Sequence, residues 1–214
     1  MRSLFNIDSP LMHFLSKAAD MLILNILFLI TCIPVFTVGA SLTALHYVTL
    51  RMVSGEEGAV SKDYFRSFRQ NFRQATAIWL LLVAFALLLA YDIHMVWNSG
   101  GYINTVVKIL SIIACAALIM ILLYVFALQA KFNNSVKGTI RNAVAVSLAA
   151  FPRTLSMFML IAACAALTFY TETTIRWGLL FWLTLGFSTV TYFNSVLLKK
   201  TFNKLIEHDT TDNE

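Results

Sequence analysis

Long runs of apolar residues alternate along the chain with short polar stretches, most of which are basic. A bilayer core requires roughly 20 apolar residues in a helix. Four runs meet this requirement, at about Ala75–Val96, Thr105–Ala130, Thr154–Tyr170 and Trp177–Leu198. The pattern predicts a transmembrane helix in each of them.

The region from Met21 to Val53 is also apolar but is too long for a single crossing. The stretch CIPVFTVGAS interrupts it, because Pro34 lacks a backbone donor and Gly39 relaxes the chain. One arrangement is a single kinked helix, with five crossings in total and the N-terminus outside. The other is a hairpin of two short helices, Met21–Ile33 and Ala40–Val53, with a cytoplasmic N-terminus. Arg2 and Lys17 favour the hairpin slightly.

The composition of the whole chain indicates an integral membrane protein. The chain is 59% hydrophobic and 13% charged, whereas soluble domains average about 45–50% apolar and about 25% charged residues. A soluble domain of this size lacks the interior to hide so many apolar side chains. We therefore predict one all-α integral membrane domain, residues 1–214. It is a polytopic transmembrane helix bundle of five to six membrane segments with interfacial amphipathic helices.

Basic residues orient the predicted bundle. They gather in the stretches 54–74, 131–153 and 199–214, while the connections on the opposite side carry few charges. Residues 131–153 contain Lys131, Lys137, Arg141 and Arg153 and no acid. Cytoplasmic loops of membrane proteins carry an excess of Lys and Arg. We therefore expect all three stretches, including the C-terminus, to be cytoplasmic in a multi-pass protein that is embedded in a lipid bilayer.

The first basic stretch is amphipathic when Lys62–Trp79 is placed on a helix. Aromatic residues form one face and arginines form a second stripe about 100° away. Such a helix lies in the headgroup region, with its rings toward the membrane and its guanidinium groups toward lipid phosphate. Because the rings are used in this way, nucleic-acid binding is disfavoured. A second interpretation is docking onto a cytoplasmic protein, through Glu56, Glu57, Arg66, Arg69, Asn71 and Arg73.

Catalytic patterns are not evident. There is no GxxxxGK[ST] loop, no HExxH motif and no GxSxG motif. Asp92 and His94 are two residues apart, a spacing that separates them on a helix. We therefore predict no enzymatic activity, no cofactor and no metal site. Polar residues around the Pro34–Gly39 break could instead line a cavity, namely Asn25, Thr37, Ser41 and His46. The alternative is that the small residues there serve helix packing.

Several motifs occur in a fixed order in the first 80 residues. They are the Asn of LN at Asn25, P-x-x-T-x-G at Pro34–Gly39, GEEG at Gly55–Gly58, and F-x-x-F-x-x-N-F-x-Q-A-T at Phe65–Thr76. This set resembles the YesL-like family of small bacterial membrane proteins of unknown function. The resemblance implies a bacterial cell membrane, in Firmicutes, and genes beside carbohydrate ABC importers.

The expected function is therefore that of a non-enzymatic accessory protein of carbohydrate (oligosaccharide) uptake, which docks on the permease or ATPase of an ABC sugar importer. The alternative is a small stand-alone transporter or channel for a polar solute. In that case the polar residues near the Pro34–Gly39 break would form the pathway.

Overall fold

The computed structural model describes residues 10–56, 58–97, 102–132 and 134–211, and every regular element in these ranges is helical. The elements are α1 (Pro10–Cys32), η1 (Val35–Thr37), α2 (Val38–Ser54), α3 (Val60–Trp97), α4 (Tyr102–Lys131), α5 (Val136–Ala149), α6 (Phe151–Thr168), α7 (Glu172–Phe181), η2 (Trp182–Gly186) and α8 (Phe187–Thr211). Among the described residues, five helical stretches are long and apolar enough to cross a membrane: Phe14–Cys32, Val60–Trp97, Asn104–Lys131, Phe151–Thr168 and Glu172–Asn203. The all-α class is confirmed, and each of the four apolar runs lies largely within one of these stretches.

The N-terminal region forms two helices rather than one kinked helix. α1 ends at Cys32, and the 3₁₀ turn η1 leads into α2 at Val38. Ser16 of α1 and Gly55 at the end of α2 line one cavity, so the chain reverses at the break and the outer ends of both helices lie together. This is the hairpin arrangement. α2 is nevertheless not one of the five candidate spans.

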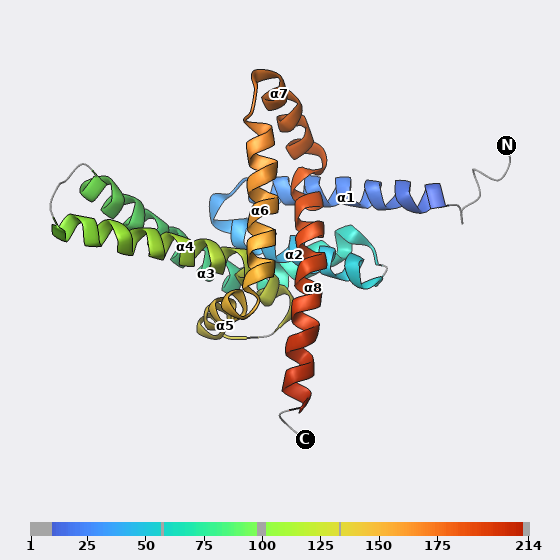
Figure 1. Cartoon of the computed structure of the whole chain (residues 1–214). Coiled ribbons are helices and arrows are strands. Elements are labelled where there is room, and N and C mark those ends of the chain that lie inside the picture. The colour runs from blue at the N-terminus through green and yellow to red at the C-terminus, as the bar shows by residue number, and fades with distance from the viewer. Residues whose placement is uncertain (1–9, 57, 98–101, 133, 212–214) are drawn as a thin grey trace.

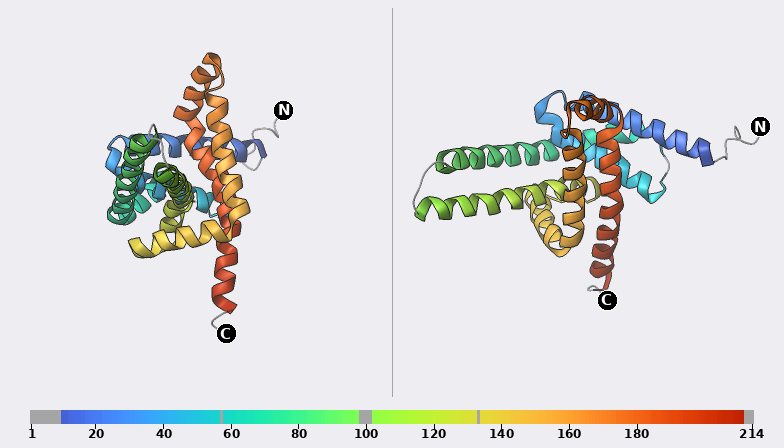
Figure 2. Two further views of the ribbon diagram at one scale, coloured as in Figure 1. Left: turned by 60° about the vertical axis from the view of Figure 1, so that its left-hand side comes forward. Right: turned by 45° about the horizontal axis from the view of Figure 1, so that its top comes forward.

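α2 forms the centre of the molecule. It packs against α3, α4 and α8, and ten of its residues from Gly39 to Leu50 are buried. The α3–α4 hairpin extends to one side of α2, and the arm formed by α6, α7 and α8 runs across it (Figures 1 and 2). Because neighbouring helices surround α2, its polar side chains, such as Thr43 and Thr49, need not face lipid.

The contact between α2 and α3 is the most extensive in the molecule. It depends on Gly39, since a Cβ atom there would lie 2.4 Å from the Ala75 carbonyl oxygen and 2.6 Å from the Cβ of Trp79. The Trp79 indole also donates a hydrogen bond of 2.9 Å to the Val35 carbonyl. Small residues let helix backbones approach closely where lipid removes the hydrophobic driving force. Two of the sequence motifs therefore meet at this contact.

α3 is a single helix of 38 residues that contains both the amphipathic stretch and the apolar run. The change in hydropathy near Ala75 is therefore not a break in the helix. Tyr64 and Ser67 are buried, whereas Phe65 is 41% exposed. The buried face of this part of α3 is therefore rotated away from the aromatic face that the sequence predicted. Packing of α3 against α2 determines which side chains are buried.

Candidate functional site

A network of ion pairs joins the end of α2 to the beginning of α3. Asp63 accepts hydrogen bonds from Arg51 Nη1 and, at 2.8 Å, from Arg66 Nη2. Arg51 Nε also donates to Glu56 Oε2 at 3.1 Å. The Asp63 side chain is only 12% exposed, whereas that of Glu56 is 60% exposed. Asp63 is therefore the central, buried member of the network.

The glycines of the GEEG motif create this geometry. Gly55 has a φ of 76° and ends α2 in the left-handed conformation, which glycine adopts without steric cost. The backbone N–H of Glu56 then bonds the Arg51 carbonyl at 3.1 Å, which turns the Glu56 side chain back toward Arg51. At Gly58 a Cβ atom would lie 2.4 Å from Asp63 Oδ2. Glu57 lies outside the described residues.

Tyr47 of α2 adds to the network on the other side of the guanidinium groups. Arg66 Nη2 donates to the Tyr47 hydroxyl at 3.0 Å, and the Arg51 and Arg66 guanidinium carbons each lie 5.9 Å from the ring centroid. Burial lowers the pKa of Arg51, but the hydrogen bond from Arg51 to Glu56 and the charge of Asp63 outweigh it, so the pKa is raised. The positive charges of two guanidinium groups thus neutralise the negative charges of two carboxylates in this network.

A cavity of about 690 Å³ borders this network. Its polar lining consists of Ser16, Lys17 and Asp20 from α1 and of Arg51, Glu56 and Asp63 from the opposite side. A smaller cavity of about 180 Å³ is lined by Tyr47, Arg51 and Lys131, among others. Arg51 and Glu56 therefore line both cavities, whose walls also include residues of α1 and of the ends of α2 and α4.

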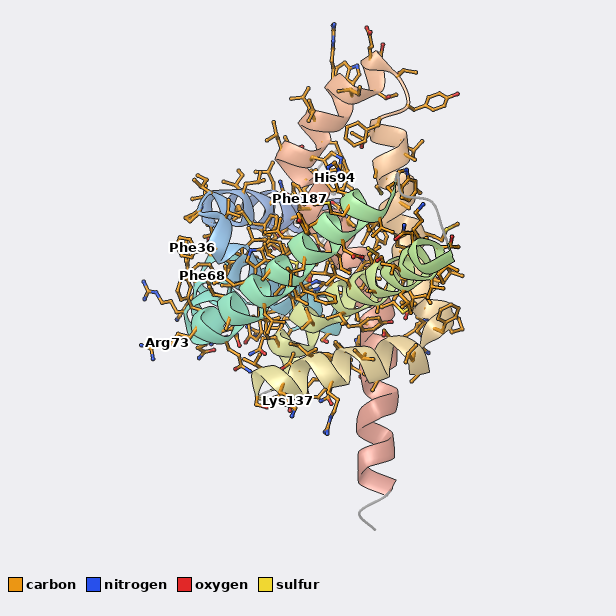
Figure 3. All side chains as sticks on the ribbon, turned by 90° about the vertical axis from the view of Figure 1, so that its left-hand side faces the viewer. Phe36, Phe68, Arg73, His94, Lys137 and Phe187 are labelled. Carbon is orange, nitrogen blue, oxygen red and sulfur yellow. The ribbon has the colours of Figure 1, made fainter. Side chains whose placement is uncertain are left out.

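A second feature is a basic face formed by the first half of α3 and by α5, defined here as Arg69, Arg73, Lys137 and Arg141. All four side chains are exposed, and within the described residues none has an ion pair or hydrogen bond. Figure 3 shows both side chains extending away from the body of the molecule, Arg73 to the left and Lys137 downward in this view. The face joins two of the basic stretches recognised in the sequence.

Buried polar contacts hold α5 against α3. Gln129 of α4 is 3% exposed; its amide donates to Asn71 Oδ1 at 3.2 Å and accepts from the Thr139 hydroxyl at 3.1 Å. Gln74 donates to the backbone carbonyl of Asn134. Ser135 caps α5 by accepting from the Gly138 N–H at 3.2 Å. The basic face is therefore carried by helices whose relative position is fixed by hydrogen bonds.

The predicted docking residues divide between these two features. Arg69 and Arg73 belong to the basic face, whereas Glu56 and Arg66 belong to the ion-pair network and Asn71 bonds Gln129. Sequence reasoning missed the pairing of Arg51 with Asp63. A signal was present, since an arginine and an aspartate 12 residues apart flank a glycine-bounded turn.

The four residues expected to line a polar cavity, Asn25, Thr37, Ser41 and His46, are all buried. Asn25, Thr37 and Ser41 are buried, and each bonds backbone groups. His46 is 9% exposed, and its Nδ1 has no partner within the described part of the chain. None of the four lines either of the two cavities described above. Asn25 bonds backbone groups at η2, and Thr37 and Ser41 bond backbone carbonyls at and beside the Pro34–Gly39 break.

Asn25 has a specific structural role at η2, a π-helical turn between α7 and α8. Its amide nitrogen donates to the Trp182 and Leu183 carbonyls at 3.0 Å each, and its Oδ1 accepts from the Ser188 N–H at 3.1 Å. A π turn disturbs the regular ladder of helical hydrogen bonds. Asn25 supplies bonds at this disturbance and fixes α1 to the last helix.

Replacing Asn25 by leucine should lower the free energy of unfolding by about 2 kcal/mol, because a buried N–H and two carbonyls lose a partner. Thermal unfolding in detergent micelles measures this loss. Amide hydrogen exchange at Ser188 should accelerate in the variant. The control is Thr184→Ala, which removes an exposed hydroxyl from the same turn and should leave Ser188 exchange unchanged. Equal exchange in both variants would contradict the role assigned to Asn25.

The Asp92 side chain contacts the neighbouring helix α4. Asp92 accepts a hydrogen bond from the Ser111 hydroxyl, which joins α3 to α4. Within the described ranges no three His, Cys, Asp or Glu residues are grouped so that they could hold a metal ion.

Comparison with known proteins finds one family model that matches part of the chain. Residues 21–93, about a third of the chain, match a family described as protein of unknown function, DUF624. No curated protein and no solved structure matches the chain. The matched segment runs from the middle of α1 through α2 and most of α3. It therefore includes Asn25, Gly39 and the complete ion-pair network.

Proposed function

We propose that this multi-pass membrane protein is a non-enzymatic accessory component of carbohydrate uptake. In this proposal it docks on an ABC sugar importer, at the permease or the ATPase, through the basic face of α3 and α5. The observation that supports docking is the exposure of Arg69, Arg73, Lys137 and Arg141 without partners in the described structure. The sugar importer as partner rests on the resemblance to the YesL-like family.

The grouping of chain segments supports a cytoplasmic position for this face. The end of α4 at Lys131 and the end of α2 at Ser54 line one cavity, and Lys199 of α8 donates to the Val53 carbonyl at 3.1 Å. The three basic stretches of the sequence therefore begin close together. Because basic segments remain on the cytoplasmic side, the region where they begin is where an ATPase or the cytoplasmic loops of a permease would be accessible.

Charge complementarity gives the proposed contact its specificity. An exposed basic patch attracts an acidic surface and steers it into register. The hydrogen bonds of Gln129 hold the two helices in place before a partner arrives, which limits the ordering cost of association.

The proposal is tested by site-specific photo-crosslinking in native membranes. A crosslinking residue placed at Arg73 or Lys137 should capture an importer subunit, and the quadruple variant R69Q/R73Q/K137Q/R141Q should lose its co-purification. The matched control removes exposed basic residues elsewhere, at Arg176 and Lys200, and should retain the partner. Capture of phospholipid alone at both positions would refute the docking proposal.

A second measurement separates the accessory role from transport by the chain alone. Liposomes that contain only this protein should show no flux of mono- or oligosaccharides above that of empty liposomes. Sugar-specific flux from the purified chain would show that it is itself a transporter.

A further inference from the structure

The cavity of about 690 Å³ between α1 and the α2–α3 connection is independent of the proposed docking face. Its volume lies within the range of small-molecule sites, which is about 300–1,000 Å³. Its walls combine charged side chains with apolar ones, among them Val48, Met52 and Val60. Such a lining suits a ligand that has both a charged and an apolar part.

Within the described part of the chain, two of the carboxylates that line the cavity have ion-pair partners, and one does not. Asp63 and Glu56 are paired with Arg51 and Arg66. Asp20 of α1 also lines the cavity, is partly buried, and has neither a hydrogen bond nor an ion pair within the described residues. A carboxylate in this position attracts a cationic group, since partial burial of a charge without a partner is unfavourable.

Two donors lie on the same cavity. The Lys17 ammonium, three residues before Asp20, is held 2.7 Å from the Tyr192 hydroxyl of α8 instead of pairing with Asp20. It also lies 4.7 Å from the centroid of the Tyr192 ring. Arg51 uses Nε and Nη1 for the two carboxylates, so its Nη2 group remains for a further acceptor. Both donor types bind phosphate well.

We propose that this cavity binds a phosphoethanolamine-type zwitterion, with its ammonium group against Asp20 and its phosphate against Lys17 and Arg51. A cationic and an anionic group on a short linker match a cavity that is lined by one unpaired carboxylate and two basic donors. The cavity borders the beginning of the candidate span Phe14–Cys32. Phe14 and Leu15 of that span are exposed, so acyl chains could continue along α1.

The same head group occurs in a membrane lipid and in a free soluble phosphodiester, and the experiment distinguishes these sources. The full-length protein is reconstituted in nanodiscs of phosphatidylcholine that contain either phosphatidylethanolamine or phosphatidylglycerol. Native mass spectrometry then counts the lipids that remain bound. In a parallel arm, glycerophosphoethanolamine is titrated into the protein in detergent by calorimetry. Preferential retention of phosphatidylethanolamine over phosphatidylglycerol in nanodiscs, or binding of glycerophosphoethanolamine in detergent, supports the head-group chemistry. The arm in which this occurs identifies the source.

The variant Asp20→Asn should weaken binding about tenfold, which corresponds to the loss of one charge-assisted hydrogen bond. Asparagine has nearly the same size, and Asp20 has no partner to lose within the described structure, so the fold should be unaffected. Glu172→Gln removes a carboxylate from the first turn of α7 and serves as the matched control with unchanged binding. Lys17→Gln should weaken binding as well, and its thermal midpoint establishes that it remains folded.

Three results would overturn the proposal. The first is equal retention of phosphatidylglycerol and phosphatidylethanolamine by the wild-type protein. The second is retention that is the same in Asp20→Asn as in Glu172→Gln. The third is an absence of binding in both the nanodisc and the calorimetric arm. Each of these outcomes leaves the docking proposal intact, because the basic face and the cavity share no residue.

Discussion

Replacing Asp63 by alanine should lower the free energy of unfolding by about 3 kcal/mol, because removing one partner leaves buried charge uncompensated. The Asp63 side chain is 12% exposed, and its two oxygens bond Arg51 and Arg66 separately. Its loss leaves both guanidinium groups without a carboxylate at this position. Arg66 is 47% exposed and can be solvated by water, so most of the loss arises at Arg51, whose side chain is 24% exposed.

The measurement is thermal or denaturant unfolding of the full chain in detergent micelles. Glu56→Gln is the matched control, because it removes a carboxylate from the same network at an exposed position. Exposed ion pairs contribute about 0–1 kcal/mol, so this control should be close to wild type. The variant Arg51→Gln should resemble Asp63→Ala, and the double variant should cost less than the sum of the two. Equal losses for Asp63→Ala and Glu56→Gln would show that the network does not hold α2 to α3.

Replacing Gly39 by alanine should also cost about 3 kcal/mol, at the upper end of the range for overpacking a core. The added Cβ atom would lie 2.4 Å from the Ala75 carbonyl oxygen. That oxygen belongs to the backbone of α3 and cannot move away as a flexible side chain would. The two helices must therefore separate, and the largest helix contact in the molecule is weakened along its length.

Gly138→Ala provides the control for Gly39→Ala. Gly138 lies in the first turn of α5, where the nearest atom to an added Cβ is the Ser135 hydroxyl oxygen at 3.2 Å. Alanine has a higher helix propensity than glycine, so this variant should be neutral or slightly more stable. Both variants are compared by thermal midpoint and by a disulfide crosslink engineered between α2 and α3. An unchanged crosslinking rate in Gly39→Ala would contradict the close approach of these helices.

Much of the fold could be predicted because apolar runs of bilayer length have few alternatives to a transmembrane helix. The runs that begin near Ala75, Thr105, Thr154 and Trp177 each coincide with a candidate span. The boundaries were less predictable. α3 begins at Val60, because the polar stretch before Ala75 finds partners on α2 and continues the helix.

The candidate sites were only partly predictable. The basic character of 54–74 and 131–153 was evident from residue counts, but their meeting in one basic face depends on Gln129 and Asn71, which are 58 residues apart. Asn25 was identified as a polar residue near the Pro34–Gly39 break and as part of a motif. Its structural role could not be predicted, because its hydrogen-bond partners Trp182 and Leu183 belong to a π turn that no local sequence pattern indicates.

The sequence by itself determined that this protein is a multi-pass helical membrane protein, which basic stretches border its helices, and that a break separates Cys32 from Val38. These properties follow from local composition, because a bilayer tolerates apolar helices and excludes charge. The tertiary structure alone decided that α2 is buried at the centre, that Arg51 and Asp63 form a buried pair, and that a charged cavity lies beside them. Such features arise where side chains distant in sequence satisfy one another's hydrogen bonds and charges, and a linear pattern does not specify those partners.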